Sequence, residues 1–340
     1  MMLYHLSHID LDGYGCQYLT YRYFRDGKFY NANYGAEIRA RLDEIVLDIK
    51  ESDFPDERPL ILITDLNLSM RDAEWLDEQI NFIDAELLLL DHHISGEVSA
   101  SKFDWYMLDI SKSATAITYS WLRESFKFDV EGDYLTLVQA INAIDIWLSR
   151  DRLFEVGKVG LGMISGAKEI NRILFPNEDR ELKLFLIEWM RLYTEIEDGH
   201  IRLDSDLHGI KKEFFKDDKD DTKDNLVAIF VSKLLSKSRD RLTIKYKGYK
   251  GLLGYSLGNS SILGNRFLVD NPDYDFYMDI SYRGSFSMRS NNRVDVAKIA
   301  EHIGNGGGHK NASGGKIRDY RDSFIYSEIR EFIQDYLNRV

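Results

Sequence analysis

The sequence predicts an α/β protein in which a doubly wound parallel-sheet domain is followed by a smaller α/β domain. Two continuous apolar runs, at residues 60–65 and 86–91, are typical of strands buried on both faces of a parallel sheet. A helical pattern at residues 70–82 separates them, and this alternation of strand and helix favours a doubly wound sheet. The chain has 340 residues, which is more than one typical domain holds.

Composition narrows the class of protein. Apolar residues make up 44 % of the chain, and its one cysteine, Cys16, excludes an internal disulfide framework and fits a reducing compartment. No apolar run reaches the roughly 18 residues that a membrane span needs, and no basic-then-apolar leader opens the sequence, so we expect a cytoplasmic protein without membrane contact. The net charge of −13 disfavours long duplex nucleic acid as a partner and favours small or short anionic substrates.

The first domain, residues 1–150, is expected to contain three strands and four helices. In chain order these are a strand at 2–7, a helix at 14–25, a strand at 60–65, a helix at 70–82 capped by Ser69, a strand at 86–91, a helix opening at 109–115 and a helix at 134–148. The aromatic residues of the first helix have helical spacing and are expected in the core. Ligands of such sheets gather at the carboxyl ends of the strands.

Acidic and histidine side chains stand where the three strands end. His8, Asp10 and Asp12 follow the first strand, and in an extended segment this spacing of two would point all three the same way. Asp65 ends the second strand, and Asp91-His92-His93 ends the third. We therefore expect these side chains to meet at one edge of the sheet.

Two helices add candidates. Asp145 lies on one line with Val138 and Ile141, so we place it on an apolar face, where a buried carboxylate needs a cation partner. We prefer a metal, with a salt bridge to an arginine as the alternative. The hydroxyls and free amides at Ser111–Thr115 suit an oxyanion or phosphate, although a simple helix cap by Ser111 or Ser113 is an equal alternative.

Carboxylates and imidazoles without thiolates suit Mn²⁺ or Mg²⁺ better than structural zinc. The candidate ligands are His8, Asp10, Asp12, Asp65, His92 and Asp145. They are too many for one ion and enough for two ions that share an aspartate, an arrangement that activates water for displacement at phosphorus. A calcium loop is excluded because Leu19 stands where a bidentate glutamate belongs.

The rest of the chain divides into a helical connector at 151–224 and a second domain at 225–340. The connector is helical at 179–203 and ends in a charged insert at 211–224, expected as a solvated loop. The expected elements of the second domain are strands at 226–231, 242–246 and 276–282, helices at 294–303 and 323–338, and a glycine-rich turn at 304–315. That turn is not a Walker loop, because Gly315-Lys316 is followed by Ile317, where a Walker loop has serine or threonine. Its backbone amides and His309 could nevertheless approach a phosphate.

Together these residues resemble the DHH phosphoesterases. The four motifs of that family are matched by His8-x-Asp10-x-Asp12-Gly13, Asp65, Asp91-His92-His93 and Asp145, and Gly306–Gly314 resembles the hallmark of the DHHA1 domain that follows it. The match spans most of the chain and looks most like the nanoRNase, or oligoribonuclease, and nucleotide-phosphatase branch. In several relatives the first histidine stands four residues before the first aspartate, a position that Leu6 occupies in this chain. His8 stands two residues before Asp10, which matches another branch of the family.

The resemblance implies two Mn²⁺ ions bridged by Asp65, with Mg²⁺ as a substitute. His8 and Asp10 would complete one site, and Asp12, His92 and Asp145 the other, while His93 would contact the scissile phosphate. Arg289 and His309 would hold the far phosphate or base. The residues that we expect to bind substrate are His93, Ser113, Arg289, Gly307, Gly308, His309 and Ser313.

The expected function is hydrolysis of very short single-stranded oligonucleotides or small phosphorylated nucleotides, and a homodimer is left open. Alternatives are a single-strand DNA exonuclease of the same superfamily, which the acidic balance disfavours, and a cyclic-dinucleotide or pyrophosphate hydrolase. A non-catalytic nucleotide sensor would have little reason to retain every metal ligand.

Overall fold

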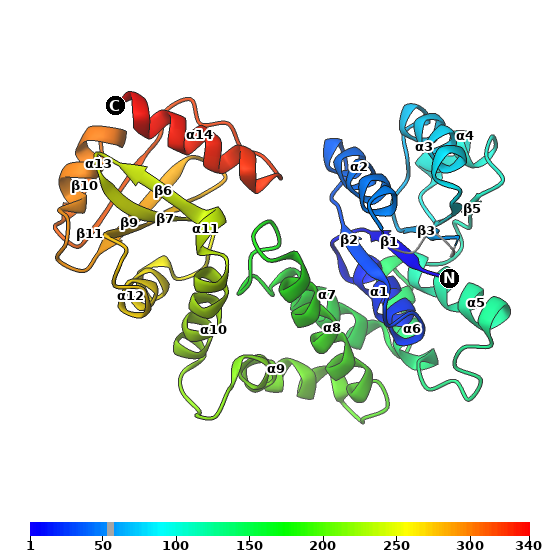
Figure 1. The fold of residues 1–340 in the computed structure, drawn as a ribbon. Coiled ribbons are helices and arrows are strands. Elements are labelled where there is room, and N and C mark those ends of the chain that lie inside the picture. The colour runs from blue at the N-terminus through cyan, green and yellow to red at the C-terminus, as the bar shows by residue number, and fades with distance from the viewer. Residues whose placement is uncertain (53–57) are drawn as a thin grey trace. The chain divides into compact units, whose positions relative to one another are not determined.

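The structure is a computed structural model that describes residues 1–52 and 58–340. The chain forms two compact units (Figure 1). The first unit contains Met1–Ala167 and Arg180–Leu207, and the second contains Lys168–Asp179 and His208–Val340. No helix of the described residues combines the length and apolarity that a membrane span requires. The functional division that we placed at residues 150 and 224 stays a prediction.

The first unit is built on a five-stranded parallel sheet, which confirms the predicted fold class. Its strands are β1 (Leu3–Ser7), β2 (Lys28–Asn31), β3 (Leu60–Thr64), β4 (Glu86–Asp91) and β5 (Tyr106–Leu108), in the order β2-β1-β3-β4-β5. Every residue of β1 and β3 is buried, as continuous apolar runs in the middle of such a sheet require. The strand order reverses between β1 and β3, and this is where doubly wound sheets bind ligands.

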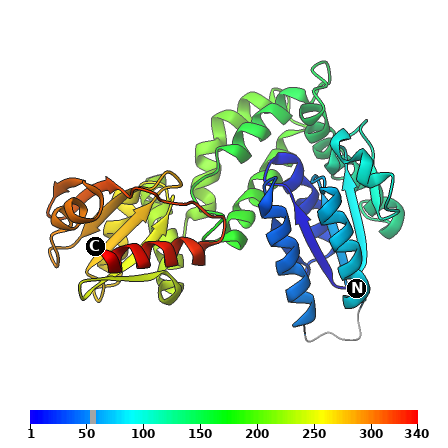
Figure 2. The ribbon, with the colours of Figure 1, turned by 90° about the horizontal axis from the view of Figure 1, so that it is seen from above.

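Helices cover both faces of this sheet. The helices of this part of the chain are α1 (Leu11–Tyr23), α2 (Ala36–Lys50), α3 (Met70–Ile83), η1 (Ile94–Gly96), α4 (Glu97–Ala100), α5 (Ala114–Phe126), α6 (Leu135–Asp145), α7 (Phe154–Ser165), α8 (Pro176–Tyr193) and α9 (Gly199–Phe215). Apolar residues of α2 and α3 pack against one face of the strands, and α5 packs against the other. Figure 2 shows α2 and α3 side by side along the sheet. The two layers fix the carboxyl ends of β1, β3 and β4 at one edge.

The second unit is a six-stranded mixed sheet with helices on both faces. Its strands are β6 (Thr243–Tyr246), β7 (Tyr249–Tyr255), β8 (Phe276–Ile280), β9 (Ser285–Ser290), β10 (Gly307–His309) and β11 (Ala312–Lys316), and its helices are α10 (Lys223–Lys237), α11 (Arg239–Leu242), α12 (Ser260–Asp270), α13 (Val296–Gly304) and α14 (Tyr326–Arg339). The sheet order is β10-β11-β9-β8-β7-β6, and only β7 and β8 are parallel. Figure 1 shows α12 on one side of this sheet and α14 on the other.

Three predictions in the middle of the chain are wrong. The expected strand at 226–231 lies inside α10, because a continuous apolar run fits a buried helix as well as a strand, and the Thr222 cap begins a helix there. The charged insert is a loop only at 216–222, since its first residues complete α9. Lys211 and Lys223 both reach Glu169, at 2.9 and 3.2 Å, so these charges are paired. The single helix expected at 179–203 is two helices, α8 and α9.

Candidate metal centre

The turn from β1 into α1 places the first three candidate ligands. Asp10 is the N-cap of α1, and its Oδ1 accepts a hydrogen bond of 3.0 Å from the amide of Gly13. The extended geometry that we expected for His8–Asp12 is therefore wrong, because the helix already begins at Leu11. A Cβ at Gly13 would lie 2.4 Å from the carbonyl oxygen of His8, so only glycine allows this tight turn.

The turn nevertheless brings the predicted ligands together. Three groups of side chains each offer ligand atoms within 4.8 Å of one another: His8, Asp10 and Asp65; Asp12, His92 and Asp145; and Asp65, His92 and His93. Asp65 joins the first group to the third, and His92 joins the third to the second. The first two groups are the two ligand sets that we predicted, apart from the bridging position of Asp65.

Asp65 lies at the centre of these groups and is 1 % exposed. Its Oδ1 is 3.3 Å from Nε2 of His92, whereas its Oδ2 has no hydrogen-bond partner and is 3.6 Å from Nδ1 of His8. A buried carboxylate oxygen without a partner is costly, and a bound cation is a usual remedy. This orphaned oxygen, facing imidazole nitrogens and other carboxylates, fits a divalent metal.

Asp12 is held by the start of α5. Its two carboxylate oxygens accept hydrogen bonds of 2.7 and 2.9 Å from the amides of Ala114 and Thr115, where the helix N-terminus favours negative charge. These amides are therefore not free for a substrate oxyanion. Ser113 caps the helix instead, with its Oγ accepting from the amide of Ala116. Because Ser113 is fully buried, we no longer propose that it contacts substrate.

His92 and His93 leave the end of β4 in different roles. Nε2 of His92 lies 3.3 to 3.8 Å from one oxygen each of Asp65, Asp145 and Asp12, so this nitrogen points into the cluster. His93 is oriented by Asp91: its Nδ1 is 2.7 Å from Oδ1 of Asp91, whose other oxygen accepts a bond of 2.6 Å from Tyr106. Asp91 therefore orients His93, and it belongs to none of the three groups of candidate ligands.

Asp145 is the last residue of α6, and its Oδ2 is 3.4 Å from Nε2 of His92. Val138 and Ile141 on the same line of the helix are buried, but the side chain of Asp145 is 22 % exposed. The buried position that we predicted for Asp145 is therefore wrong, because the helix ends there. Among the described residues no lysine or arginine pairs with Asp145, which leaves the metal as the better account of this carboxylate.

Without a metal, the cluster holds more negative charge than its surroundings neutralise. Burial raises the pKa of Asp65, and the carboxylates of Asp12 and Asp10 raise it further. Burial and Asp10 likewise raise the pKa of Asp12, and burial and Asp12 raise that of Asp145 to about 8. Burial alone would lower the pKa of His8, but its contacts with Asp10 and Asp65 raise it to about 10. The raised pKa values reflect carboxylates that lie close together without enough neutralising charge around them.

Tyr34 is a site residue that the sequence analysis missed. Its hydroxyl is 3.2 Å from Nε2 of His93, and its ring lies 4.8 Å from the ring of His8. Burial and Asp65 raise the pKa of this phenol, so it stays a hydrogen-bond donor. It follows β2, a strand that we did not predict. Had Lys28–Asn31 been recognised as a neighbour of β1, its carboxyl end would have been searched for such a residue.

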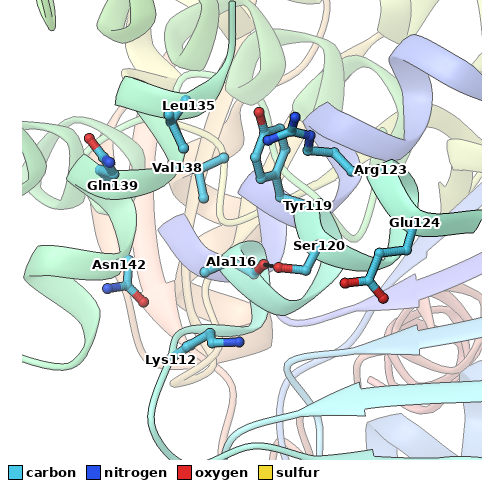
Figure 3. A pocket seen from close by; sticks show the side chains of 10 residues that line it. All are labelled: Lys112, Ala116, Tyr119, Ser120, Arg123, Glu124, Leu135, Val138, Gln139 and Asn142. Carbon is cyan, nitrogen blue, oxygen red and sulfur yellow. Dashed lines mark hydrogen bonds between the residues drawn. The ribbon is translucent and has the colours of Figure 1, made fainter. Parts of the chain in front are cut away.

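A groove of about 590 Å³ runs between α5 and α6 (Figure 3). Its lining includes Lys112, Tyr119 and Arg123 on one side and Val138 and Asn142 on the other. None of the clustered metal-ligand candidates lines it. Oδ1 of Asn142 instead accepts a hydrogen bond of 2.8 Å from the amide of Ser113, which ties α6 to the start of α5. The groove therefore flanks the metal centre and is not part of it.

The remaining candidates lie in the second unit. Arg289 on β9 pairs with Ala312 on β11, which pairs with His309 on β10, so this row of neighbours shares one face of the sheet. Arg289 is half-buried and donates to Oγ of Ser261, whereas His309 is exposed. The expected glycine-rich turn is the β10–β11 hairpin, in which Gly307 faces Gly314 and Gly308 faces Ser313.

Gly308 and Ser313 serve this hairpin. Gly308 has a φ of +145°, and a Cβ there would lie 2.5 Å from the carbonyl oxygen of Ala312. The hydroxyl of Ser313 is buried and donates a bond of 2.7 Å to the carbonyl of Val296, so we no longer propose that it contacts substrate. The contacts of Arg289, Gly307, Gly308 and His309 with substrate stay predictions.

Comparison with known proteins finds one matching domain family and similar proteins along the whole chain. Residues 270–339 match the model of the DHHA1 domain. Over 351 aligned positions the chain is 42 % identical to a 3′,5′-cyclic-nucleotide phosphodiesterase of Helicobacter pylori, with 99 % of each chain covered. A crystal structure of an uncharacterized protein from Helicobacter pylori is 41 % identical, covers 100 % of both chains and superposes with a TM-score of 0.92.

Proposed function

Because the chain belongs to the DHH/DHHA1 phosphoesterase family, we propose that it is a metal-dependent phosphodiesterase of very short oligonucleotides and small phosphorylated nucleotides. The observation that carries this proposal is the grouping of His8, Asp10 and Asp65 beside Asp12, His92 and Asp145. Four separate strand and helix ends supply these residues, and Oδ2 of Asp65 has no protein partner. Such a site has no evident structural purpose without a cation.

We assign these six residues as ligands of two Mn²⁺ ions, with Mg²⁺ as a substitute, shared through Asp65. When bound, the ions would activate water and stabilise the charge that develops on the phosphoryl oxygens. Carboxylate and imidazole donors without thiolate suit these metals. The tie between Asp12 and the amides of Ala114 and Thr115 holds one carboxylate in place, so the site is preorganised by the fold.

The protein's own hydrogen-bond donors would act beside the ions. Asp91 raises the pKa of His93 through their hydrogen bond, which favours the imidazolium form. A positively charged His93 would donate from Nε2 to a non-bridging oxygen of the scissile phosphate, and the hydroxyl oxygen of Tyr34, 3.2 Å from the same nitrogen, would accept a share of this hydrogen bond and hold the ring in place. This contact can strengthen as charge builds up in the transition state.

The second unit is proposed to bind the part of the substrate that does not carry the reacting phosphate. Arg289 and His309 share a sheet face with the small side chain of Ala312 between them. A guanidinium fork is suited to a phosphate, and the amides of Gly307 and Gly308 can approach one closely.

A second substrate class is favoured by the relative in Helicobacter pylori, whose name is 3′,5′-cyclic-nucleotide phosphodiesterase. A cyclic nucleotide and a dinucleotide both contain a phosphodiester between a 3′ and a 5′ oxygen, so the same metal centre could hydrolyse either. The net charge of the chain, −13, disfavours long single-stranded nucleic acids as substrates.

The test is a substrate panel with purified protein and Mn²⁺. The panel contains a dinucleotide, a 3′,5′-cyclic nucleotide, a 24-mer, a 3′,5′-bisphosphonucleoside and pyrophosphate, and Asp65→Asn is the inactive control. We expect release of mononucleotide from the dinucleotide or the cyclic nucleotide and little from the 24-mer. Preference for the 24-mer would favour the exonuclease alternative, and no metal-dependent hydrolysis of any diester would contradict the proposal.

A further inference from the structure

The end of α6 has an unusual residue in an ordinary motif. The amide of Leu148 donates a hydrogen bond of 2.7 Å to the carbonyl oxygen of Ala143. The amide of Trp147 donates one of 3.3 Å to the carbonyl oxygen of Ile144. These two bonds define a Schellman motif, in which the residue after the C-cap takes the left-handed conformation. Here that residue is Trp147, with φ +58°.

Neither the backbone nor the core accounts for a tryptophan at this position. Glycine is the usual residue because a Cβ is strained in the left-handed region, and a bulky side chain there is an outlier. Burial does not offset the strain, since Trp147 is 67 % exposed. Its ring contact is an edge-on one with Phe154, at 5.2 Å between centroids. Strain of this kind is found at functional sites.

Trp147 stands beside the metal centre. It is two residues after Asp145, so their Cα atoms are at most roughly 7.6 Å apart. The segment that follows contains Arg150 and Arg152, which are exposed and have no ion-pair partner among the described residues. The carboxylate of Asp151 between them accepts a hydrogen bond from the amide of Leu153. An exposed indole therefore follows a candidate metal ligand by two residues, and two guanidinium groups without ion-pair partners follow in the same segment.

We propose that Trp147 is a specificity-determining residue that stacks on a nucleobase of the substrate. This inference rests on the proposed function and adds to it a reason why nucleotides are preferred over phosphodiesters without a base. Every nucleobase has a π-face, so the contact is tolerant of base identity. It would contribute about a 10- to 100-fold gain in affinity, which is the range of base–aromatic stacking.

Equilibrium binding separates a base contact from a phosphate contact. Titration calorimetry with Mn²⁺ would compare 5′-AMP with ribose 5-phosphate for the wild type, Trp147→Gly and Trp147→Phe. We expect Trp147→Gly to lose about 10- to 100-fold in affinity for AMP and little for ribose 5-phosphate, and Trp147→Phe to retain most of it. Phe82→Ala, which removes an aromatic side chain that is 79 % exposed, should change neither affinity.

Thermal melting separates this role from a structural one. Glycine relieves the left-handed strain, so Trp147→Gly should melt no lower than the wild type, whereas a packing role would lower the melting temperature. Equal affinity of the wild type for AMP and ribose 5-phosphate, or an equal loss for both ligands in Trp147→Gly, would overturn the inference. Absence of hydrolysis across the substrate panel would overturn the proposed function instead, so the two failures are distinguishable.

Discussion

Replacing Asp145 by asparagine is expected to stabilise the metal-free protein and to weaken the stabilisation that Mn²⁺ provides. Burial and the carboxylate of Asp12 raise the pKa of Asp145 from 3.8 to about 8. The folded state therefore binds this proton more tightly than the unfolded state, and the free energy of unfolding falls as pH rises from about 4 to about 8. The asparagine has no proton to lose and avoids this penalty.

The size of the effect follows from the shift in the pKa of Asp145. A change from 3.8 to about 8 corresponds to at most about 6 kcal/mol at pH 8. The side chain is 22 % exposed, and Asp12 can take up the proton in its place, so we expect about 1–2 kcal/mol. For a unit of this size that is a rise of about 2 to 8 °C in melting temperature.

The assay is thermal melting in a chelator and in saturating Mn²⁺, from pH 4.5 to pH 8. In the chelator, Asp145→Asn should match the wild type near pH 4.5 and melt higher at pH 8. In Mn²⁺ the order should reverse, because the variant has lost a ligand. Asp133→Asn, an exposed carboxylate ahead of the same helix, should change neither curve. An unchanged Mn²⁺-dependent rise in Asp145→Asn would refute the assignment of Asp145 as a ligand.

Three further variants test groups around the metals. Tyr34→Phe should keep its metals and lose about 3- to 10-fold in kcat, since one hydrogen bond to His93 is removed; loss of metal would contradict this. Asp91→Asn should cost about 10- to 100-fold in kcat at unchanged metal content, because it frees the ring of His93, and an unaffected kcat would show that this orientation is unimportant. Arg289→Ala should lose about 10- to 100-fold in kcat/KM on a dinucleotide, and little on bis-p-nitrophenyl phosphate. Lys310→Ala is its control, and an equal loss on both substrates would mean that Arg289 acts at the chemical centre or in folding.

The strands and helices that carry the proposed metal ligands could be predicted because their sequence patterns are compatible with only one type of secondary structure. The apolar runs at 60–65 and 86–91 become β3 and β4 within a residue, and Ser69 caps α3 as expected. The residues at 226–231 failed because an apolar run of that length is compatible with either element. The short strands β2 and β5 were missed because three or four residues with mixed burial carry little periodic signal.

The candidate ligands could be found from sequence because they follow strand ends, which topology brings to one edge. Their partners could not, because each depends on packing between distant segments. The bonds from the amides of Ala114 and Thr115 to Asp12 join residues about a hundred positions apart, and no local pattern indicates them. The same holds for Tyr34, which reaches His93 from an unpredicted strand.

The most direct test of a two-metal phosphodiesterase is to count bound metal and turnover in the same preparations. Native mass spectrometry at saturating Mn²⁺ would be paired with hydrolysis of a dinucleotide, for the wild type and for Asp65→Asn. The wild type should hold two ions per chain, and Asp65→Asn should lose turnover together with at least one ion while its circular dichroism is unchanged. One ion per chain with full turnover in the wild type would contradict the account.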